Sequence, residues 1–201
     1  MGDTVLIKFD QLRLERNYGE AFRLLQARLA QGYFDSPFDK AHDQVALALT
    51  QYLAGDAAGA KATAEQARDT FESLFRDQPD NALFAASLSQ AYAAMGQKDL
   101  ALREAERAIM LRSKDRAAAP SFEENLALVQ TIFGENNGAI STLTQLLHTP
   151  YRISLYSITP VTPALLRLDP LWDPLRGDPA FQRLCEEKID KSIAVQKAAT
   201  R

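Results

Sequence analysis

Histidine and cysteine are the side chains most often used for acid–base, nucleophilic and metal chemistry, and this chain has two histidines and one cysteine. His42 falls near the start of an expected helix and His148 in an expected loop, and no spacing links either one to a carboxylate or to the other. A solvated or hydrogen-bonded surface histidine is therefore favoured over a metal or acid–base role. Cys185 stands beside Leu184 and near Phe181 on the expected last helix, which favours a packed thiol over a nucleophile.

Two further groups of polar side chains could bind a ligand. The segment from Tyr151 to Ser157 collects hydroxyl groups and one arginine, so it is either a ligand-contacting loop or a plain connector. The basic residues between Arg103 and Arg116 alternate with Glu104, Glu106 and Asp115, at spacings of three and four residues. This pattern predicts a solvated helix face with ion pairs rather than a stripe that binds nucleic acid.

The composition excludes several classes of function. The chain has 201 residues, a net charge of −3 and a pI near 5.5, which argues against a nucleic-acid partner. One cysteine excludes an internal disulfide and a four-cysteine zinc site, and no stretch approaches 18 apolar residues, so no membrane insertion is expected. No metal, cofactor or catalytic residue is predicted. The early acidic residues do not fit a signal peptide, so we expect a cytoplasmic chain, or a periplasmic one if it is a fragment of a membrane-anchored protein.

Alanine and leucine supply 32 and 27 residues, and both are strong helix formers, so an all-α fold is expected. A repeated pattern organises these helices. A turn glycine is followed five residues later by alanine at Gly55, Gly96 and Gly134, and Arg16 with Ala21 is a fainter copy. The intervals between the four turns are 39, 41 and 38 residues. Apolar residues flank each turn at helical spacing, so the repeated unit is a helix, a turn and a second helix.

Local signals place the helix boundaries. Gly55–Asp56 predicts a helix end followed by a helix cap, and Ser36–Pro37 predicts a capped helix start. Pro79 predicts the end of a long helix over 57–77, and Ser121 with Glu124 has the spacing of a capping box. Residues 4–14 alternate as a strand would, but the repeat register favours a helix there.

Four helix pairs are expected over residues 1–147, and a different pattern follows from residue 148. The approximate ranges of the pairs are 1–34, 36–78, 81–116 and 120–147. Residues 148–160 predict a loop, and Thr162–Pro163 predicts a short helix. Three Asp-Pro pairs then predict capped turns that lead into a last helix from about Pro179. Residues 148–201 are expected to form a capping tail that packs on the last pair through four apolar side chains, Trp172, Leu175, Phe181 and Leu184.

The segment from Leu88 to Ala108 resembles a tetratricopeptide (TPR) repeat, because Leu88, Tyr92, Gly96, Ala101 and Ala108 fall on the pattern positions of that family. The intervals exceed the roughly 34 residues of the family repeat, which implies longer helices or connections. The order of elements, with the Asp-Pro tail from Ala164 to Leu184, resembles the C-terminal TPR region of bacterial multidomain signalling proteins. The resemblance implies a right-handed α-α superhelix, a solenoid whose partner is a protein.

In that family certain first-helix positions face a concave groove. In this sequence the resemblance assigns to the groove seven candidate binding residues: His42, Leu49, Tyr52, Gln90, Glu124, Leu128 and Thr131. No lysine or arginine occupies the positions that clamp a peptide carboxylate in chaperone-binding members. The groove is then either open to a helix or extended apolar segment, or covered by neighbouring helices or by another domain.

The sequence therefore predicts a non-enzymatic interaction or scaffold module that binds a protein or peptide, which could be another domain of the same polypeptide. The alternative is a sensor whose groove and tail loop bind a small molecule or peptide, with Tyr52, Arg152, Tyr156 and Trp172 as candidate contacts. The sequence leaves open the identity of the partner, the oligomeric state and whether the chain is a fragment.

The repeat register can be tested at Ala101. Ala101→Leu should lower the free energy of unfolding by about 1–3 kcal/mol, because the larger side chain overpacks a close contact between helices. Denaturant unfolding measures this change, and a difference of less than a few tenths of a kcal/mol would show that the register is wrong.

Overall fold

The computed structural model describes residues 2–115, 117–151, 154–157 and 159–188, and every regular element in these ranges is a helix. The all-α class is thereby confirmed, and residues 4–14 lie in a helix rather than a strand. The helices, in chain order, are α1 (Gly2–Leu14), α2 (Tyr18–Gln31), α3 (Pro37–Leu53), α4 (Ala57–Asp77), α5 (Ala82–Ala94), α6 (Lys98–Arg112), α7 (Ala119–Ile132), α8 (Asn136–His148), α9 (Pro163–Leu168), the 3-10 helix η1 (Pro170–Leu175) and α10 (Pro179–Glu186).

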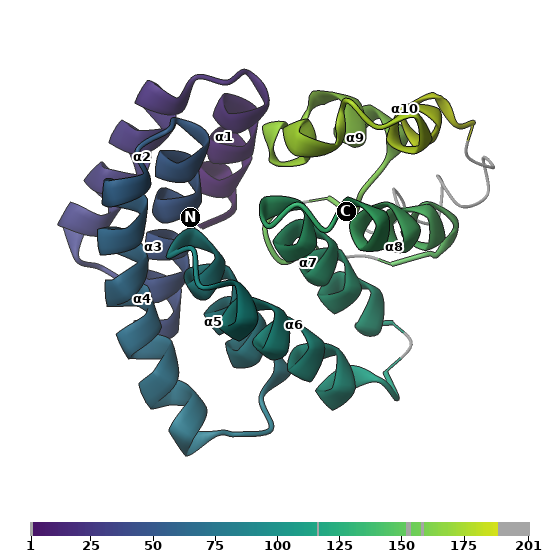
Figure 1. The fold of residues 1–201 in the computed structure, drawn as a ribbon. Coiled ribbons are helices and arrows are strands. Elements are labelled where there is room, and N and C mark those ends of the chain that lie inside the picture. Colours follow the sequence, from purple (N-terminus) through teal and green to yellow (C-terminus); the bar gives the residue numbers. More distant parts are fainter. Residues whose placement is uncertain (1, 116, 152–153, 158, 189–201) are drawn as a thin grey trace. The chain divides into compact units, whose positions relative to one another are not determined.

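The chain divides into two compact units, Met1–Leu111 and Arg112–Arg201. In the first unit, consecutive helices from α1 to α5 pack on one another, and α3 also contacts α5 (Figure 1). In the second unit α7 packs on α8, while η1 packs on α7 and α10 contacts both α8 and α9. The fourth helix pair thus belongs to the same compact unit as the tail.

The four turns share one backbone conformation. The φ angles of Gly55, Gly96 and Gly134 are 82°, 75° and 74°, and that of Arg16 is 57°. In each turn the N–H of the next residue donates to a carbonyl five residues back, such as Asp56 N–H to Gln51 O at 2.8 Å and Asn17 N–H to Leu12 O at 2.9 Å. This left-handed helix ending is ordinary for glycine and strained for arginine. The faint first copy of the repeat therefore has the same turn as the other three.

The alanines that follow each turn by five residues lie in closely packed positions. Ala21, Ala60, Ala101 and Ala139 are all fully buried. An alanine side chain adds little volume between two helix axes, so the second helix of each pair can approach its neighbours closely. The recurring alanines of the sequence are thus packing positions and not only helix formers.

In two of the hairpins a glutamine side chain faces a glycine. The carboxylate of Asp56 and the side-chain amide of Gln51 fill the space that a Cβ atom at Gly59 would need, and the amide of Gln130 lies 2.8 Å from the place of a Cβ atom at Gly138. Both glutamines stand four residues before the turn glycine and both partner glycines stand four residues after it. The second and fourth hairpins therefore share a glutamine–glycine contact, to which the second adds the carboxylate of Asp56.

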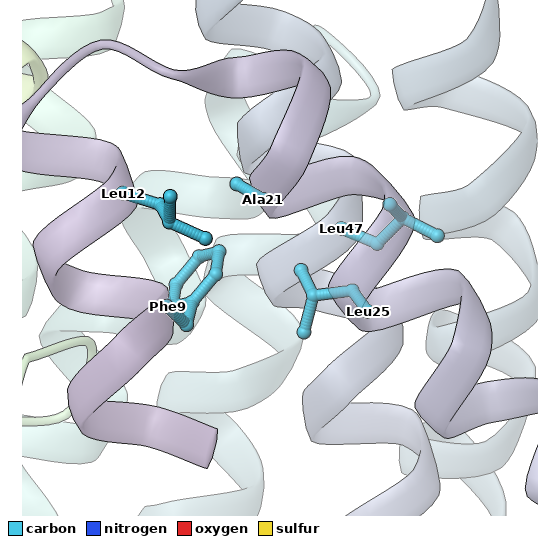
Figure 2. Close-up of a cluster of buried hydrophobic side chains, with 5 residues drawn as sticks. All are labelled: Phe9, Leu12, Ala21, Leu25 and Leu47. Atoms are coloured by element: carbon cyan, nitrogen blue, oxygen red, sulfur yellow. The ribbon is translucent and has the colours of Figure 1, made fainter. Parts of the chain in front are cut away.

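The core of the first unit begins between α1, α2 and α3. Phe9 and Leu12 of α1 pack against Ala21 and Leu25 of α2 and Leu47 of α3 (Figure 2). Each of these five side chains is at most 6% exposed, so α1 is held by its apolar contacts. This burial explains why residues with strand-like alternation form a helix.

Most helix ends follow the local signals. The Ser36 hydroxyl accepts a hydrogen bond from Asp39 N–H at 3.2 Å ahead of α3, and Asp56 caps α4 through Gly59 N–H at 2.8 Å. The long helix predicted over 57–77 is α4.

The predicted capping box at Ser121 is wrong. α7 begins two residues earlier, at Ala119, and the chain ahead of it is turned by Asp115, whose carboxylate accepts from Ala117 N–H and Ala118 N–H. Pro120 fits within the first turn because the missing N–H has no acceptor there. Glu124 is then one turn too deep in the helix to cap it.

The tail places its apolar side chains inward. Trp172, Leu175, Phe181 and Leu184 are all buried. Asp169 caps η1 through Leu171 N–H and Asp178 caps α10 through Ala180 N–H. The second aspartate of the Asp-Pro series departs from the expectation, because Asp173 lies within η1 and its carboxylate binds Arg176 Nε at 2.5 Å. The chain end beyond residue 188 lies outside the described residues.

The steric strain of the positive φ angle at Arg16 can be tested by substitution. Arg16→Gly should raise the free energy of unfolding by about 1 kcal/mol relative to Arg16→Ala, because only glycine adopts a positive φ without a steric cost. The alanine variant is the matched control, since it also lacks the arginine side chain but keeps a Cβ atom. Urea unfolding followed by circular dichroism measures both, and equal stabilities would contradict a left-handed turn at this residue.

Candidate functional site

Three of the seven candidate binding residues lie at helical spacing along α3. His42 is half-buried and its ring stacks on Phe38 with the centroids 5.9 Å apart. Leu49 is buried, and Tyr52 in the last turn is 37% exposed. This face of α3 is thus apolar along its middle and accessible at Tyr52.

Gln90 of α5 is not accessible in the same way. It is 3% exposed, on a helix that has nearly all of its side chains buried. A partner that approached from solvent could touch Tyr52 directly but not Gln90.

The three candidates in the second unit lie on α7 and are buried. Glu124, Leu128 and Thr131 are each at most 2% exposed. Thr131 donates its hydroxyl hydrogen bond to the carbonyl of Ala127 in its own helix, at 2.8 Å. These positions therefore agree with the covered alternative for the groove and not with an open one.

The carboxylate of Glu124 binds two tyrosines from the non-helical chain after α8. Tyr151 Oη donates to Glu124 Oε2 at 2.8 Å, and Tyr156 Oη donates to Glu124 Oε1 at 2.9 Å. We refer to these three residues as the Glu124 clasp. Each carboxylate oxygen receives one phenolic hydroxyl, which offsets part of the cost of burying the charge.

The clasp is joined to the tail. Tyr151 Oη also accepts a hydrogen bond from Val161 N–H at 2.9 Å. The ring of Tyr156 meets Trp172 of η1 edge-on, with the centroids 6.2 Å apart. One carboxylate on α7 thus organises both the segment after α8 and the start of the capping tail.

Burial raises the pKa of Tyr151 and of Tyr156 well above the ordinary value for tyrosine, and the nearby charge of Glu124 raises both further. A high pKa keeps each hydroxyl protonated. Both tyrosines are therefore hydrogen-bond donors throughout the neutral pH range.

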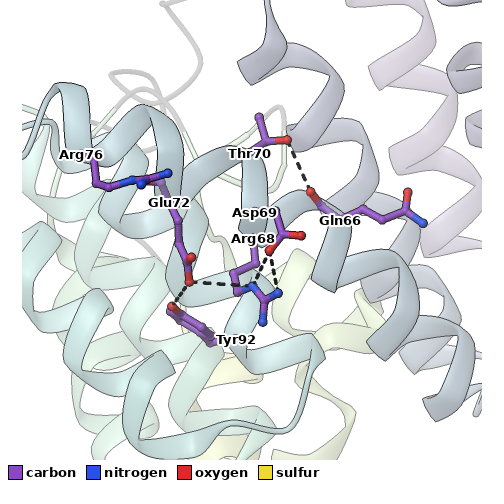
Figure 3. Close-up of polar contacts among 7 residues, drawn as sticks. All are labelled: Gln66, Arg68, Asp69, Thr70, Glu72, Arg76 and Tyr92. Carbon is purple, nitrogen blue, oxygen red and sulfur yellow. Dashed lines mark hydrogen bonds and ion pairs between the residues drawn. The ribbon is translucent and has the colours of Figure 1, made fainter.

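A second carboxylate–tyrosine contact joins α4 and α5 in the first unit (Figure 3). Tyr92 Oη donates to Glu72 Oε1 at 2.8 Å, and Arg68 Nε lies 3.8 Å from the same oxygen. Arg68 also binds Asp69, at 2.6 Å from Nη2. Burial, followed by the hydrogen bond to Glu72 and its charge, raises the pKa of Tyr92 to about 12. This network ties the two helices together at the surface of the unit.

The residues with the most reactive side chains are placed in packing or surface roles. His148 Nε2 lies 3.0 Å from Glu187 Oε1, and Cys185 is a buried thiol whose pKa is raised by burial. Among the described residues, no group of three or more His, Cys, Asp or Glu side chains could hold a metal ion.

Sequence reasoning missed the partnership within the clasp. It singled out Glu124 as a cap and a groove residue, and the Tyr151–Ser157 segment as rich in hydroxyls, without connecting the two. The partners are 27 and 32 residues apart and no spacing rule joins them. The ion pair of the half-buried Arg28 with the buried Asp43, which links α2 and α3, had no sequence signal either.

No protein-family model and no curated protein sequence matches this chain. None of the helices in the described part of the chain combines the length and the apolar character needed to cross a membrane. What the fold defines by itself is a set of helical hairpins, the last of which forms one compact unit with the folded tail.

The raised pKa of Tyr92 predicts a loss of stability in alkali. Unfolded tyrosine loses its proton near pH 10, whereas folded Tyr92 keeps it until about pH 12, so this contribution is complete below pH 10 and is lost as the pH rises from 10 to 12. Tyr92→Phe should therefore lose less stability over that interval than the wild type, after an initial cost of about 1 kcal/mol at neutral pH. Urea unfolding at several pH values from 8 to 11 measures how steeply the free energy of unfolding falls with pH.

The matched control is Tyr33→Phe, because Tyr33 is 93% exposed. The free energy of unfolding of Tyr33→Phe should fall with pH as steeply as that of the wild type. Parallel curves for Tyr92→Phe and the wild type would show that the hydroxyl of Tyr92 does not couple folding to pH.

Proposed function

We propose that this chain is a non-enzymatic protein-interaction module, a solenoid of TPR-like hairpins that serves as a regulatory part of a larger bacterial signalling protein. The observation that carries the proposal is the repeated hairpin, with four left-handed turns 39, 41 and 38 residues apart and a buried alanine five residues after each. Arrays of this kind present an extended surface to a protein partner. The signalling context is supported by the resemblance of the Asp-Pro tail.

The surface best suited to bind a partner is the exposed end of the α3 face at Tyr52. Tyrosine combines a large apolar ring with a hydrogen-bonding hydroxyl, and it is enriched where proteins bind one another. Tyr52 is the one of the seven candidates whose side chain is exposed, at 37%. The partner is a protein or peptide, including another domain of the same polypeptide.

The small-molecule alternative receives less support. Tyr156 donates its hydroxyl to Glu124, and Trp172 is buried against the ring of Tyr156. Arg152 lies outside the described residues. Two of the three aromatic contacts expected for a ligand are thus used within the chain itself.

A photo-crosslinking phenylalanine analogue at position 52 tests the proposal in the native host. We expect a discrete adduct with one protein or with another domain of the parent polypeptide, identified by mass spectrometry. The purified partner should then bind the wild type at least about tenfold more tightly than Tyr52→Ala, the effect of losing one aromatic contact at the centre of an interface.

Position 33 is the matched control, because Tyr33 is the more exposed tyrosine and lies outside the helices, between α2 and α3. The same analogue there should give no such adduct, and Tyr33→Ala should bind normally. Identical adducts from both positions, or none from position 52, would contradict the proposed surface.

A further inference from the structure

We draw no further inference here: the strongest candidate, the side-chain cluster of Glu72, Tyr92 and Glu104 on α4, α5 and α6, is a pair of carboxylates near one phenolic hydroxyl, and nothing in the described part of the chain shows what lies against the buried Oε2 atom of Glu104.

Discussion

The close approach of two helices behind a left-handed turn is the contact on which this architecture depends. Each hairpin reverses at a residue with positive φ, and five residues later an alanine is completely buried. A larger side chain at that alanine would separate the helices, and a turn of another type would direct the second helix elsewhere. The polar contacts from Tyr92 to Glu72 and from Arg28 to Asp43 join helices of successive hairpins, α4 to α5 and α2 to α3.

The features that could be predicted from the sequence are those determined within one hairpin. The turn and alanine positions depend on residues at most five apart, and the interval of 39 residues was enough to identify Arg16 as a turn despite its side chain. The range of α4 followed from a cap at one end and a proline after the other. Local chemistry also placed Ser36 and Thr162 correctly as helix caps.

The candidate site was less predictable because its contacts are not local. Ser121 and Glu124 have the spacing of a capping box, but a proline one residue earlier lets the helix start sooner, and the carboxylate is used by tyrosines 27 and 32 residues further on. The register assigned seven residues to one groove, yet burial differs sharply among them, from Tyr52 at 37% exposed to Leu128 at 0%. Register states which side of a helix a residue occupies, whereas burial depends on what the rest of the chain places over that side.

The glutamine–glycine contact of the second and fourth hairpins has an evolutionary consequence. Since the carboxylate of Asp56 and the amide of Gln51 occupy the space next to Gly59, a side chain gained at position 59 requires both to move, and one gained at position 138 requires Gln130 to move. Substitutions at the two members of each pair should therefore be correlated among descendants of this sequence. The third hairpin has Tyr92 and Leu100 at the corresponding places, so it has neither the glutamine nor the glycine of this contact.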